Sequence, residues 1–242
     1  EGKIALVTGG GGGIGRMVAD VLVGEGAKVY IVGRTEATLN KAVAELAGQK
    51  GECVALPGDL STVEGVRAVA ARLAELEDSL DLLVNNAGVF QGGLSWERSV
   101  EDWEWTFGVH VYGIIHAIRI FVPRMIAQDT EGHVVNTASV AAFVAGPFSS
   151  PYVVSKCAAL SLSECLALDL AAVGSKIGAS VLTPSSFDTP ASAPAPISRS
   201  SYPSPLKSPT VLTLVPELSP TSIPSIRNPL RPSNSLSRTT AS

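Results

Sequence analysis

The chain has 242 residues, of which 45% are hydrophobic, so it is long enough for one domain with a sizeable core. A formal net charge of −4 gives no basic footprint for nucleic acid or an anionic membrane, and neither partner is expected. No apolar stretch reaches the roughly 18 uncharged residues of a membrane-spanning helix, and no signal-like segment opens the chain. Cys53, Cys157 and Cys165 lack the spacing of a zinc site or a disulfide framework. We therefore expect a cytoplasmic protein with no metal site.

A glycine-rich turn separates the first predicted strand from the first predicted helix. The strand covers residues 3–8 (KIALVT), and residues 9–15 (GGGGGIG) lead into an amphipathic helix that ends near Glu25. Glycines let the backbone approach a ligand closely, and a helix N-terminus offers free N–H groups to a phosphate. A flexible linker is the alternative, although linkers rarely stand between a buried strand and an amphipathic helix. The pattern favours phosphate binding.

The second predicted strand, residues 28–32, ends in Gly33 and Arg34 and is followed by a helix over residues 36–46. At this point of a dinucleotide-binding fold an acidic residue suits the ribose hydroxyl of NAD, whereas an arginine suits the 2′-phosphate of NADP. Because Arg34 stands here without an acid, the sequence favours NADP(H) over NAD(H). The alternative is that Arg34 only solvates the strand end, and Gly12 stands where a second basic residue would have strengthened the case.

Four more strands and their helices continue the alternation. Strands are predicted over residues 53–56, 80–84, 133–138 and 176–182. Ser61 and Glu64 have the spacing of a capping box, and a long helix is predicted from Ser99 to about Ala127, with Pro123 kinking or shortening its last turns. Strict β–α alternation predicts a single α/β domain of the Rossmann-like type, a doubly wound parallel sheet with helices on both faces.

Three polar side chains in residues 139–156 have a joint chemical use. Tyr152 and Lys156 stand four residues apart, which places them on one face of a helix, and Ser139 closes the strand before it. A free phenol has a pKa of about 10, and a nearby cation lowers it, so Tyr152 becomes a usable acid or base. Taken alone, a Tyr and a Lys at this spacing also occur by chance in many proteins.

Taken together, residues 3–189 closely resemble the short-chain dehydrogenase/reductase family. The family's Thr-Gly-x-x-x-Gly-x-Gly begins at Thr8, its Asp is Asp59, its Asn-Asn-Ala-Gly is residues 85–88, and its Tyr-x-x-x-Lys begins at Tyr152. The resemblance implies reversible hydride transfer between a nicotinamide cofactor and an alcohol or carbonyl carbon. The cofactor contacts that it implies, with Arg34 added, are Thr8, Gly9, Gly11, Gly12, Gly13, Ile14, Gly15, Arg34, Asp59, Leu60, Asn86, Ala87, Gly88, Tyr152, Lys156 and Thr189.

The same resemblance implies the catalytic roles. Tyr152 passes the proton, Lys156 lowers the pKa of Tyr152 and binds the nicotinamide ribose, and Ser139 holds the substrate oxygen. The family's usual helix Asn, which completes a proton relay through water, is replaced by His110. His110 either preserves that relay or is a packed histidine with no catalytic part, and the sequence leaves both open.

The C-terminal part departs from the family. Pro184-Ser185 replaces the family's Pro-Gly, while Thr189 matches a position that often contacts the cofactor. Residues 191–242 hold 10 Pro and 13 Ser but no Gly, and such a composition predicts an irregular, disordered tail. We divide the chain into a catalytic domain, residues 1–190, and this tail. The tail is either a genuine extension that replaced the substrate lid or sequence read in a shifted frame after about Phe187.

Two functions therefore compete. The first is an oxidoreductase that transfers a hydride between NADP(H) and an alcohol or ketone. The second is a cofactor-binding protein without effective catalysis, because the family's substrate lid and last strand are missing from the sequence. Apolar residues around Phe143 and Phe148 favour an apolar substrate. The long helix and the Tyr152 helix are candidate surfaces for a homodimer.

Overall fold

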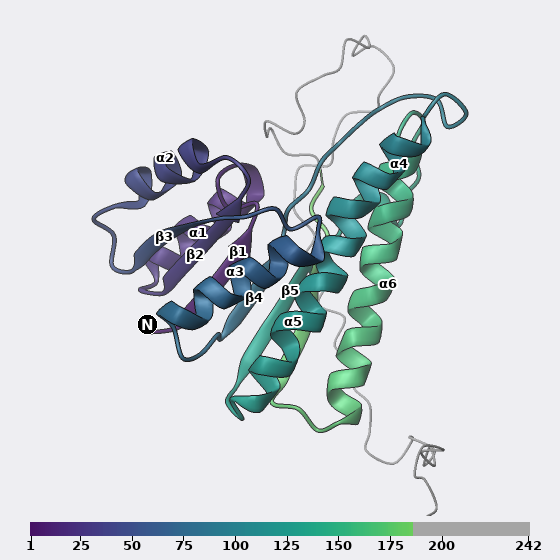
Figure 1. The fold of residues 1–242 in the computed structure, drawn as a ribbon. Helices are drawn as coiled ribbons and strands as arrows, with labels where there is room; N and C mark the ends of the chain where they lie inside the picture. Colours follow the sequence, from purple (N-terminus) through teal and green to yellow (C-terminus); the bar gives the residue numbers. More distant parts are fainter. Residues whose placement is uncertain (186–242) are drawn as a thin grey trace, which may run out of the picture.

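A six-stranded parallel sheet forms the centre of the computed structural model, which describes residues 1–185 (Figure 1). The strand order is β3-β2-β1-β4-β5-β6, and every neighbouring pair is parallel. The predicted Rossmann-like fold is confirmed. Thr189 and residues 191–242 lie outside the described residues. The strands are β1 (Ile4–Thr8), β2 (Lys28–Gly33), β3 (Glu52–Pro57), β4 (Leu82–Asn85), β5 (Gly132–Thr137) and β6 (Ile177–Leu182).

Helices cover both faces of the sheet, because successive strand side chains point to opposite sides and both sides are apolar. Ala5 and Val7 of β1 pack with α1 and α2, whereas Leu6 between them packs with α3, α5 and α6. The helical segments are α1 (Gly13–Gly24), α2 (Glu36–Leu46), α3 (Val63–Leu76), α4 (Val100–Phe107), the π-helical turn η1 (Gly108–Tyr112), α5 (Gly113–Ala127), the 3₁₀ turn η2 (Val140–Ala142) and α6 (Ser150–Ala172).

The start of α3 differs from the prediction by one residue. Thr62, not Ser61, caps the helix, and its hydroxyl accepts a hydrogen bond from the Gly65 N–H at 3.1 Å. Ser61 instead donates its backbone N–H and its hydroxyl to the Asp59 carboxylate, at 3.0 and 2.7 Å. The expected capping box at Ser61 is therefore wrong, because Ser61 is hydrogen-bonded to the Asp59 carboxylate instead of capping the helix.

The long helix begins as predicted but is interrupted once. Ser99 and Asp102 form a reciprocal capping box at the start of α4, and α4, η1 and α5 follow without a break to Ala127. Pro123 lies inside α5, so the predicted shortening of the last turns is wrong. The carbonyl that Pro123 leaves without an N–H partner belongs to Arg119, an exposed residue, where water can replace the lost donor.

By length and composition, Val100–Ala127 is the one helical run in the described part of the chain that is apolar enough to cross a membrane. Core helices of globular proteins pass the same test. Ala117, Phe121 and Met125 are buried against the sheet and α3. Packing within the domain therefore accounts for the buried face of α5.

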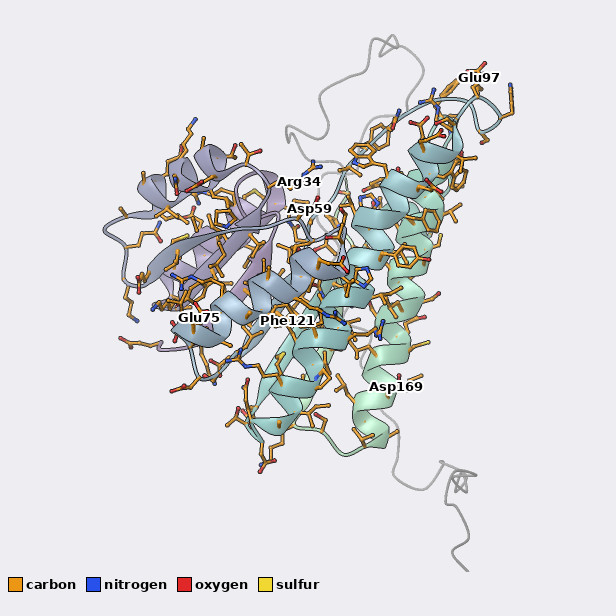
Figure 2. All side chains as sticks on the ribbon, in the orientation of Figure 1. Arg34, Asp59, Glu75, Glu97, Phe121 and Asp169 are labelled. Carbon is orange, nitrogen blue, oxygen red and sulfur yellow. The ribbon has the colours of Figure 1, made fainter. Side chains whose placement is uncertain are left out.

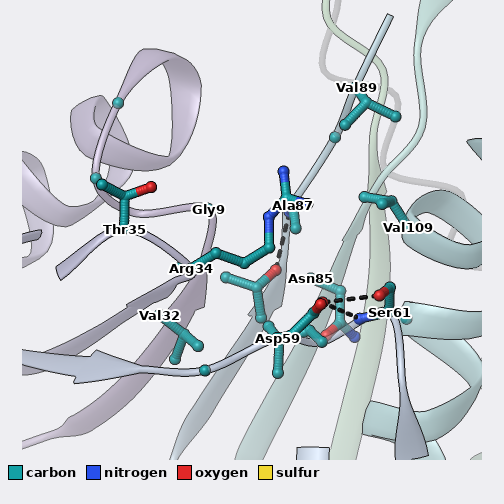
Figure 3. A pocket seen from close by; sticks show the side chains of 18 of the residues that line it. Gly9, Val32, Arg34, Thr35, Asp59, Ser61, Asn85, Ala87, Val89 and Val109 are labelled. Atoms are coloured by element: carbon teal, nitrogen blue, oxygen red, sulfur yellow. Dashed lines mark hydrogen bonds between the residues drawn. The ribbon is translucent and has the colours of Figure 1, made fainter. Parts of the chain in front are cut away.

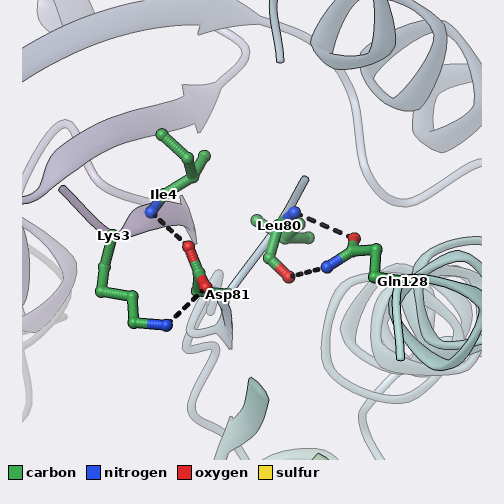
Figure 4. Close-up of polar contacts among 5 residues, drawn as sticks. All are labelled: Lys3, Ile4, Leu80, Asp81 and Gln128. Atoms are coloured by element: carbon green, nitrogen blue, oxygen red, sulfur yellow. Dashed lines mark hydrogen bonds and ion pairs between the residues drawn. The ribbon is translucent and has the colours of Figure 1, made fainter. Parts of the chain in front are cut away.

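The edge of the sheet opposite the carboxyl ends of the strands is closed by side chains that bind backbone groups (Figure 4). Asp81 accepts from the Ile4 N–H at 2.8 Å and pairs with the Lys3 ammonium at 2.8 Å. Gln128, just after α5, bonds both the N–H and the carbonyl of Leu80, at 3.0 and 3.1 Å. These contacts hold β1, β4 and α5 together at the amino ends of the strands. The carboxyl ends of the strands are left for binding.

Candidate active site

A pocket opens at the carboxyl ends of β1, β2 and β4 (Figure 3). It lies where β1 and β4 meet and the strand order reverses, which is where open α/β sheets bind ligands. Several predicted cofactor residues line it: Thr8, Gly9, Gly11, Gly12, Arg34, Asp59, Leu60, Ala87 and Gly88. The predicted residues Gly13, Ile14, Gly15, Asn86, Tyr152 and Lys156 do not line this pocket.

The glycine turn is shaped by close backbone contacts. Gly9 has a φ of 67°, in the region that favours glycine. A Cβ on Gly15 would lie 2.4 Å from the Gly9 carbonyl oxygen, so no other residue fits there without movement. Gly12 precedes α1 and supplies no capping side chain. The first N–H groups of α1 are therefore available to a phosphate.

Thr8 joins the end of β1 to the loop after β4. Its hydroxyl accepts hydrogen bonds from the N–H groups of Asn86 and Ala87, at 2.7 and 2.9 Å. The Asn86 side chain returns a bond to the Thr8 carbonyl at 3.1 Å. Asn86 thus positions the loop that walls the pocket, which explains why it is adjacent to the pocket without lining it.

At the β2 end of the pocket, an arginine and an aspartate lie close together (Figure 2). Hydrogen bonds from the Ser61 N–H and hydroxyl lower the pKa of Asp59, and the positive charge of Arg34 adds to the effect. Arg34 is exposed and, within residues 1–185, has no hydrogen bond or ion pair of its own. Its guanidinium is therefore free to meet an anionic group.

Ser139, Tyr152 and Lys156 come together where β5 meets α6. Ser139 lies two residues after β5, and its hydroxyl accepts from the Ala141 N–H at 3.1 Å. The Lys156 ammonium donates to the Thr137 carbonyl at 2.9 Å and lies 5.6 Å from the Tyr152 ring centroid. The serine, phenol and ammonium that the spacing suggested thus share one region.

The pKa of the phenol differs from the expectation. Burial raises the pKa of Tyr152, and a hydrogen bond with Ser139 opposes that rise. Burial also lowers the pKa of Lys156 to about 8. The Lys156 ammonium lies over the Tyr152 ring and donates to the Thr137 carbonyl.

His110 lies in η1 and is buried beside Tyr152, with the ring centroids 5.5 Å apart. Its Nε2 accepts from the Val89 N–H at 2.8 Å, and its Nδ1 lies 2.8 Å from the Ser155 hydroxyl oxygen. Burial, helped by the charge of Lys156, holds the pKa of His110 well below its ordinary value. Val89 also lines the pocket, so His110 connects the pocket wall with α6.

An apolar side chain packs against the phenol, and others are exposed on the loop before α6. Phe90 packs edge to face on Tyr152, with ring centroids 5.4 Å apart, and is half exposed. Phe143, Val144 and Phe148 are exposed nearby in the chain, between η2 and α6. Phe148 has a φ of 59°, and its carbonyl accepts from the Gly93 N–H at 2.9 Å. The loop after β4 is thereby joined to the loop before α6.

Sequence reasoning missed part of the pocket. Some of the missed residues stand next to predicted residues in the sequence, and that position is a signal for them. Gly113 and Ile114 carry no such signal, since they reach the pocket only because α5 packs against β4. The missed lining residues are Val32, Gly33, Thr35, Thr38, Leu39, Gly58, Ser61, Asn85, Val89, Val109, Gly113 and Ile114.

Metal ligands are a separate question. In residues 1–185 no group of three or more His, Cys, Asp or Glu side chains is placed to hold a metal ion. The ionisable groups at or near the pocket are instead Arg34, Asp59, His110, Tyr152 and Lys156. These groups suit proton transfer and hydrogen bonding to a polar ligand.

The chain is similar to known oxidoreductases. A family model described as short chain dehydrogenase matches residues 3–198. The probable oxidoreductase EphD of Mycobacterium tuberculosis is 35% identical over 186 residues, which are 77% of this chain and 31% of EphD. The chain therefore spans about a third of the length of that curated relative.

Two solved structures extend the comparison. A short chain dehydrogenase/reductase from Burkholderia phymatum in complex with NAD is 39% identical, with a TM-score of 0.75 covering 78% of this chain and 67% of that one. The Pseudomonas aeruginosa RhlG/NADP active-site complex is 37% identical, with a TM-score of 0.73 covering 78% of this chain and 74% of that one. Similar proteins thus bind either dinucleotide.

Proposed function

The chain belongs to the short-chain dehydrogenase family of NAD(P)-dependent oxidoreductases, and on that premise we propose that it prefers NADP(H) and acts on an apolar alcohol or ketone. The observation that carries the proposal is the convergence of Ser139, Tyr152 and Lys156 beside a pocket with a glycine cradle. When bound, the nicotinamide supplies or accepts the hydride. The residues of this chain do the remaining work.

The pocket fits a dinucleotide. The turn at Gly9 and Gly15 has no room for a Cβ, and the N–H groups at the start of α1 suit a pyrophosphate. Arg34 at the β2 end has an uncommitted guanidinium, which suits the extra phosphate of NADP. Asp59, whose lowered pKa keeps it ionised, suits hydrogen-bond donors on the adenine side. Arg34 is thus the basis of the NADP preference.

Proton transfer rests on Tyr152. Because burial raises the pKa of the phenol, Tyr152 is protonated at neutral pH and serves as the proton donor when a ketone is reduced. Ser139 holds the substrate oxygen near that proton. Lys156, with a pKa of about 8, lies close enough to stabilise the phenolate that remains.

The remaining parts of the proposal concern substrate and assembly. The half-exposed Phe90 and the exposed Phe143 favour an apolar substrate. Exposed apolar side chains on the long helix and α6, including Trp105 and Leu168, support a homodimer through these helices, which lie side by side along one border of the molecule (Figure 1). The cytoplasmic location stays a prediction from sequence, as does Thr189 as a cofactor contact.

Replacing the phenol tests the function. Tyr152→Phe removes the proton donor and should lower turnover at least about 100-fold, the usual contribution of a positioned acid. NADPH affinity should change less than about threefold. Absorbance of NADPH with a panel of apolar ketones measures turnover, and nicotinamide fluorescence measures binding.

Tyr112→Phe is the matched control, because Tyr112 is exposed and the same hydroxyl is lost. Near-normal turnover in Tyr152→Phe would overturn the assignment. If the unaltered protein binds NADPH tightly but turns over no ketone or alcohol in the panel, the alternative of a cofactor-binding protein without catalysis replaces the proposal.

A further inference from the structure

A line of three hydrogen bonds connects the pocket wall to the helix that carries the phenol. The Val89 N–H donates to His110 Nε2 at 2.8 Å, and His110 Nδ1 lies 2.8 Å from Ser155 Oγ. The Ser155 hydroxyl lies 2.7 Å from the Tyr152 carbonyl oxygen. Three segments far apart in sequence, the loop after β4, η1 and α6, are therefore linked through one imidazole.

The direction of each bond follows from the two ends of the line. A backbone N–H can only donate, so His110 Nε2 is the acceptor and carries no proton. A carbonyl oxygen can only accept, so the Ser155 hydroxyl donates its proton to Tyr152. The Ser155 oxygen is then left to accept from His110 Nδ1, which carries the proton of the neutral ring. Only one tautomer satisfies all three bonds.

The surroundings of the imidazole favour that same neutral form. His110 and Ser155 are 1% and 0% exposed, so neither is within reach of bulk water. The ionisable groups that face the ring are Tyr152, edge to face at 5.5 Å, and Lys156, whose positive charge opposes protonation. A proton added at Nε2 would point at the Val89 N–H. Both ring nitrogens are fully used by their present partners.

We propose that His110 and Ser155 are positioning residues that hold the Val89 wall of the pocket in register with Tyr152, and that His110 neither gives up nor takes up a proton during the reaction. This rests on the proposed function only in taking Tyr152 as the proton donor. The sequence left two roles open for His110, a proton relay and a packed histidine with no catalytic part. The hydrogen bonds favour a third role, in which His110 positions other residues without moving a proton. Ser155 was not among the predicted residues.

Ser155→Ala breaks the line at one bond and leaves His110 Nδ1–H without a partner. We expect kcat per folded molecule to fall about tenfold, with the shape of its pH profile from pH 6 to 9 unchanged. Ser163→Ala is the matched control. Ser163 is also a buried serine of α6 that accepts from a side-chain amide, at 3.0 Å, and donates to a carbonyl, but it has no link to Val89. Its kcat should stay within about twofold of normal.

His110→Gln separates positioning from relay, because its amide oxygen can still accept from Val89 while the bond to Ser155 is lost. Its kcat should fall no further when Ser155→Ala is added, since both changes break the same line. Equal kcat in Ser155→Ala and Ser163→Ala would overturn positioning. A limb of the pH profile that disappears in His110→Gln would overturn the claim that His110 does not exchange a proton during the reaction.

Nitrogen-15 NMR of the unaltered protein gives a test that survives poor folding of any variant. The His110 ring should show a protonated Nδ1, a bare Nε2 and no titration from pH 6 to 9. The opposite tautomer, or a ring that titrates in this range, would overturn the proposal. This readout does not involve turnover, so it stands or falls separately from the Tyr152→Phe result.

Discussion

Burial shifts the pKa values of Tyr152 and Lys156, both on α6, in opposite directions, and both shifts favour the neutral side chain. It raises the pKa of Tyr152 and lowers the pKa of Lys156 to about 8, because a buried site disfavours either charge. The sequence predicted which residues meet, since a spacing of four along a helix fixes their face. It did not predict the direction of the phenol pKa, because that depends on how deeply the folded chain buries the phenol.

The proposed preference for NADP(H) depends on one residue, Arg34. Arg34→Ala should weaken NADPH binding about 10- to 100-fold, because hydrogen bonds between charged groups contribute about 1.5–3 kcal/mol. NADH binding should change less than about threefold, since NADH lacks the 2′-phosphate. Fluorescence titrations with both dinucleotides measure the two affinities.

Arg72→Ala is the control for a lost positive charge, because Arg72 is exposed on α3 and, among residues 1–185, pairs only with Glu75. It should leave both affinities unchanged. An equal loss of NADPH and NADH affinity in Arg34→Ala would mean that Arg34 binds a group common to both dinucleotides, and the proposed preference would be wrong.

Among the elements, those with repeating apolar patterns were predicted well and those shaped by local polar competition were not. The helix over residues 36–46 and the start of the long helix after Ser99 matched the structure. The cap of α3 moved to Thr62 because Asp59 engages Ser61. The π-helical turn η1 had no signal, because residues 108–112 fit an ordinary helix equally well.

The glycine turn before α1 is an element whose residue choice the backbone dictates. Gly15→Ala would place a Cβ 2.4 Å from the Gly9 carbonyl oxygen and 2.5 Å from the Asn86 amide nitrogen. Because both neighbours belong to the turn or its wall, the turn must shift. We expect NADPH affinity to fall at least about tenfold and the melting temperature to drop, as measured by fluorescence and calorimetry.

Gly24→Ala makes the same change at the other end of α1. The nearest atom to its Cβ would be a Gln49 side-chain oxygen at 3.5 Å, an ordinary contact. Since alanine favours helix over glycine by up to about 1 kcal/mol, this variant should keep its affinity and gain slightly in stability. Normal NADPH affinity in Gly15→Ala would show that the turn can move to accept a Cβ without loss of binding.

For the molecule as a whole, strict β–α alternation was enough to predict the parallel sheet and, through it, a site at the carboxyl ends of the strands. Right-handed crossovers leave few topologies for such a pattern. The hydrogen bonds of His110 could not be predicted from the sequence. Val89 and His110 lie 21 residues apart, His110 and Ser155 lie 45 apart, and nothing in these residue types implies contact. Long-range polar contacts of this kind need the packed structure.

A second buried polar line ties the middle of the sheet to α6. The Asn85 amide donates to Asn136 Oδ1 at 2.8 Å, and the Asn136 amide donates to the Ser163 hydroxyl at 3.0 Å. Asn136 is 0% exposed, so water cannot replace it. Asn136→Ala leaves two buried partners unsatisfied and should lower the free energy of unfolding by about 2–4 kcal/mol, as measured by urea denaturation.

Asn40→Ala is the matched surface control, since Asn40 is exposed on α2, and its free energy of unfolding should change by no more than about 0.5 kcal/mol. Asn136 does not line the pocket, although its partner Asn85 does, and we expect the destabilised protein still to bind NADPH. A saturating concentration of about 100 times Kd should restore about 2.7 kcal/mol to the folded form. An Asn136→Ala loss under about 1 kcal/mol would mean that the sheet and α6 do not depend on this line. Failure of NADPH to restore stability would instead mean that the line also supports the pocket.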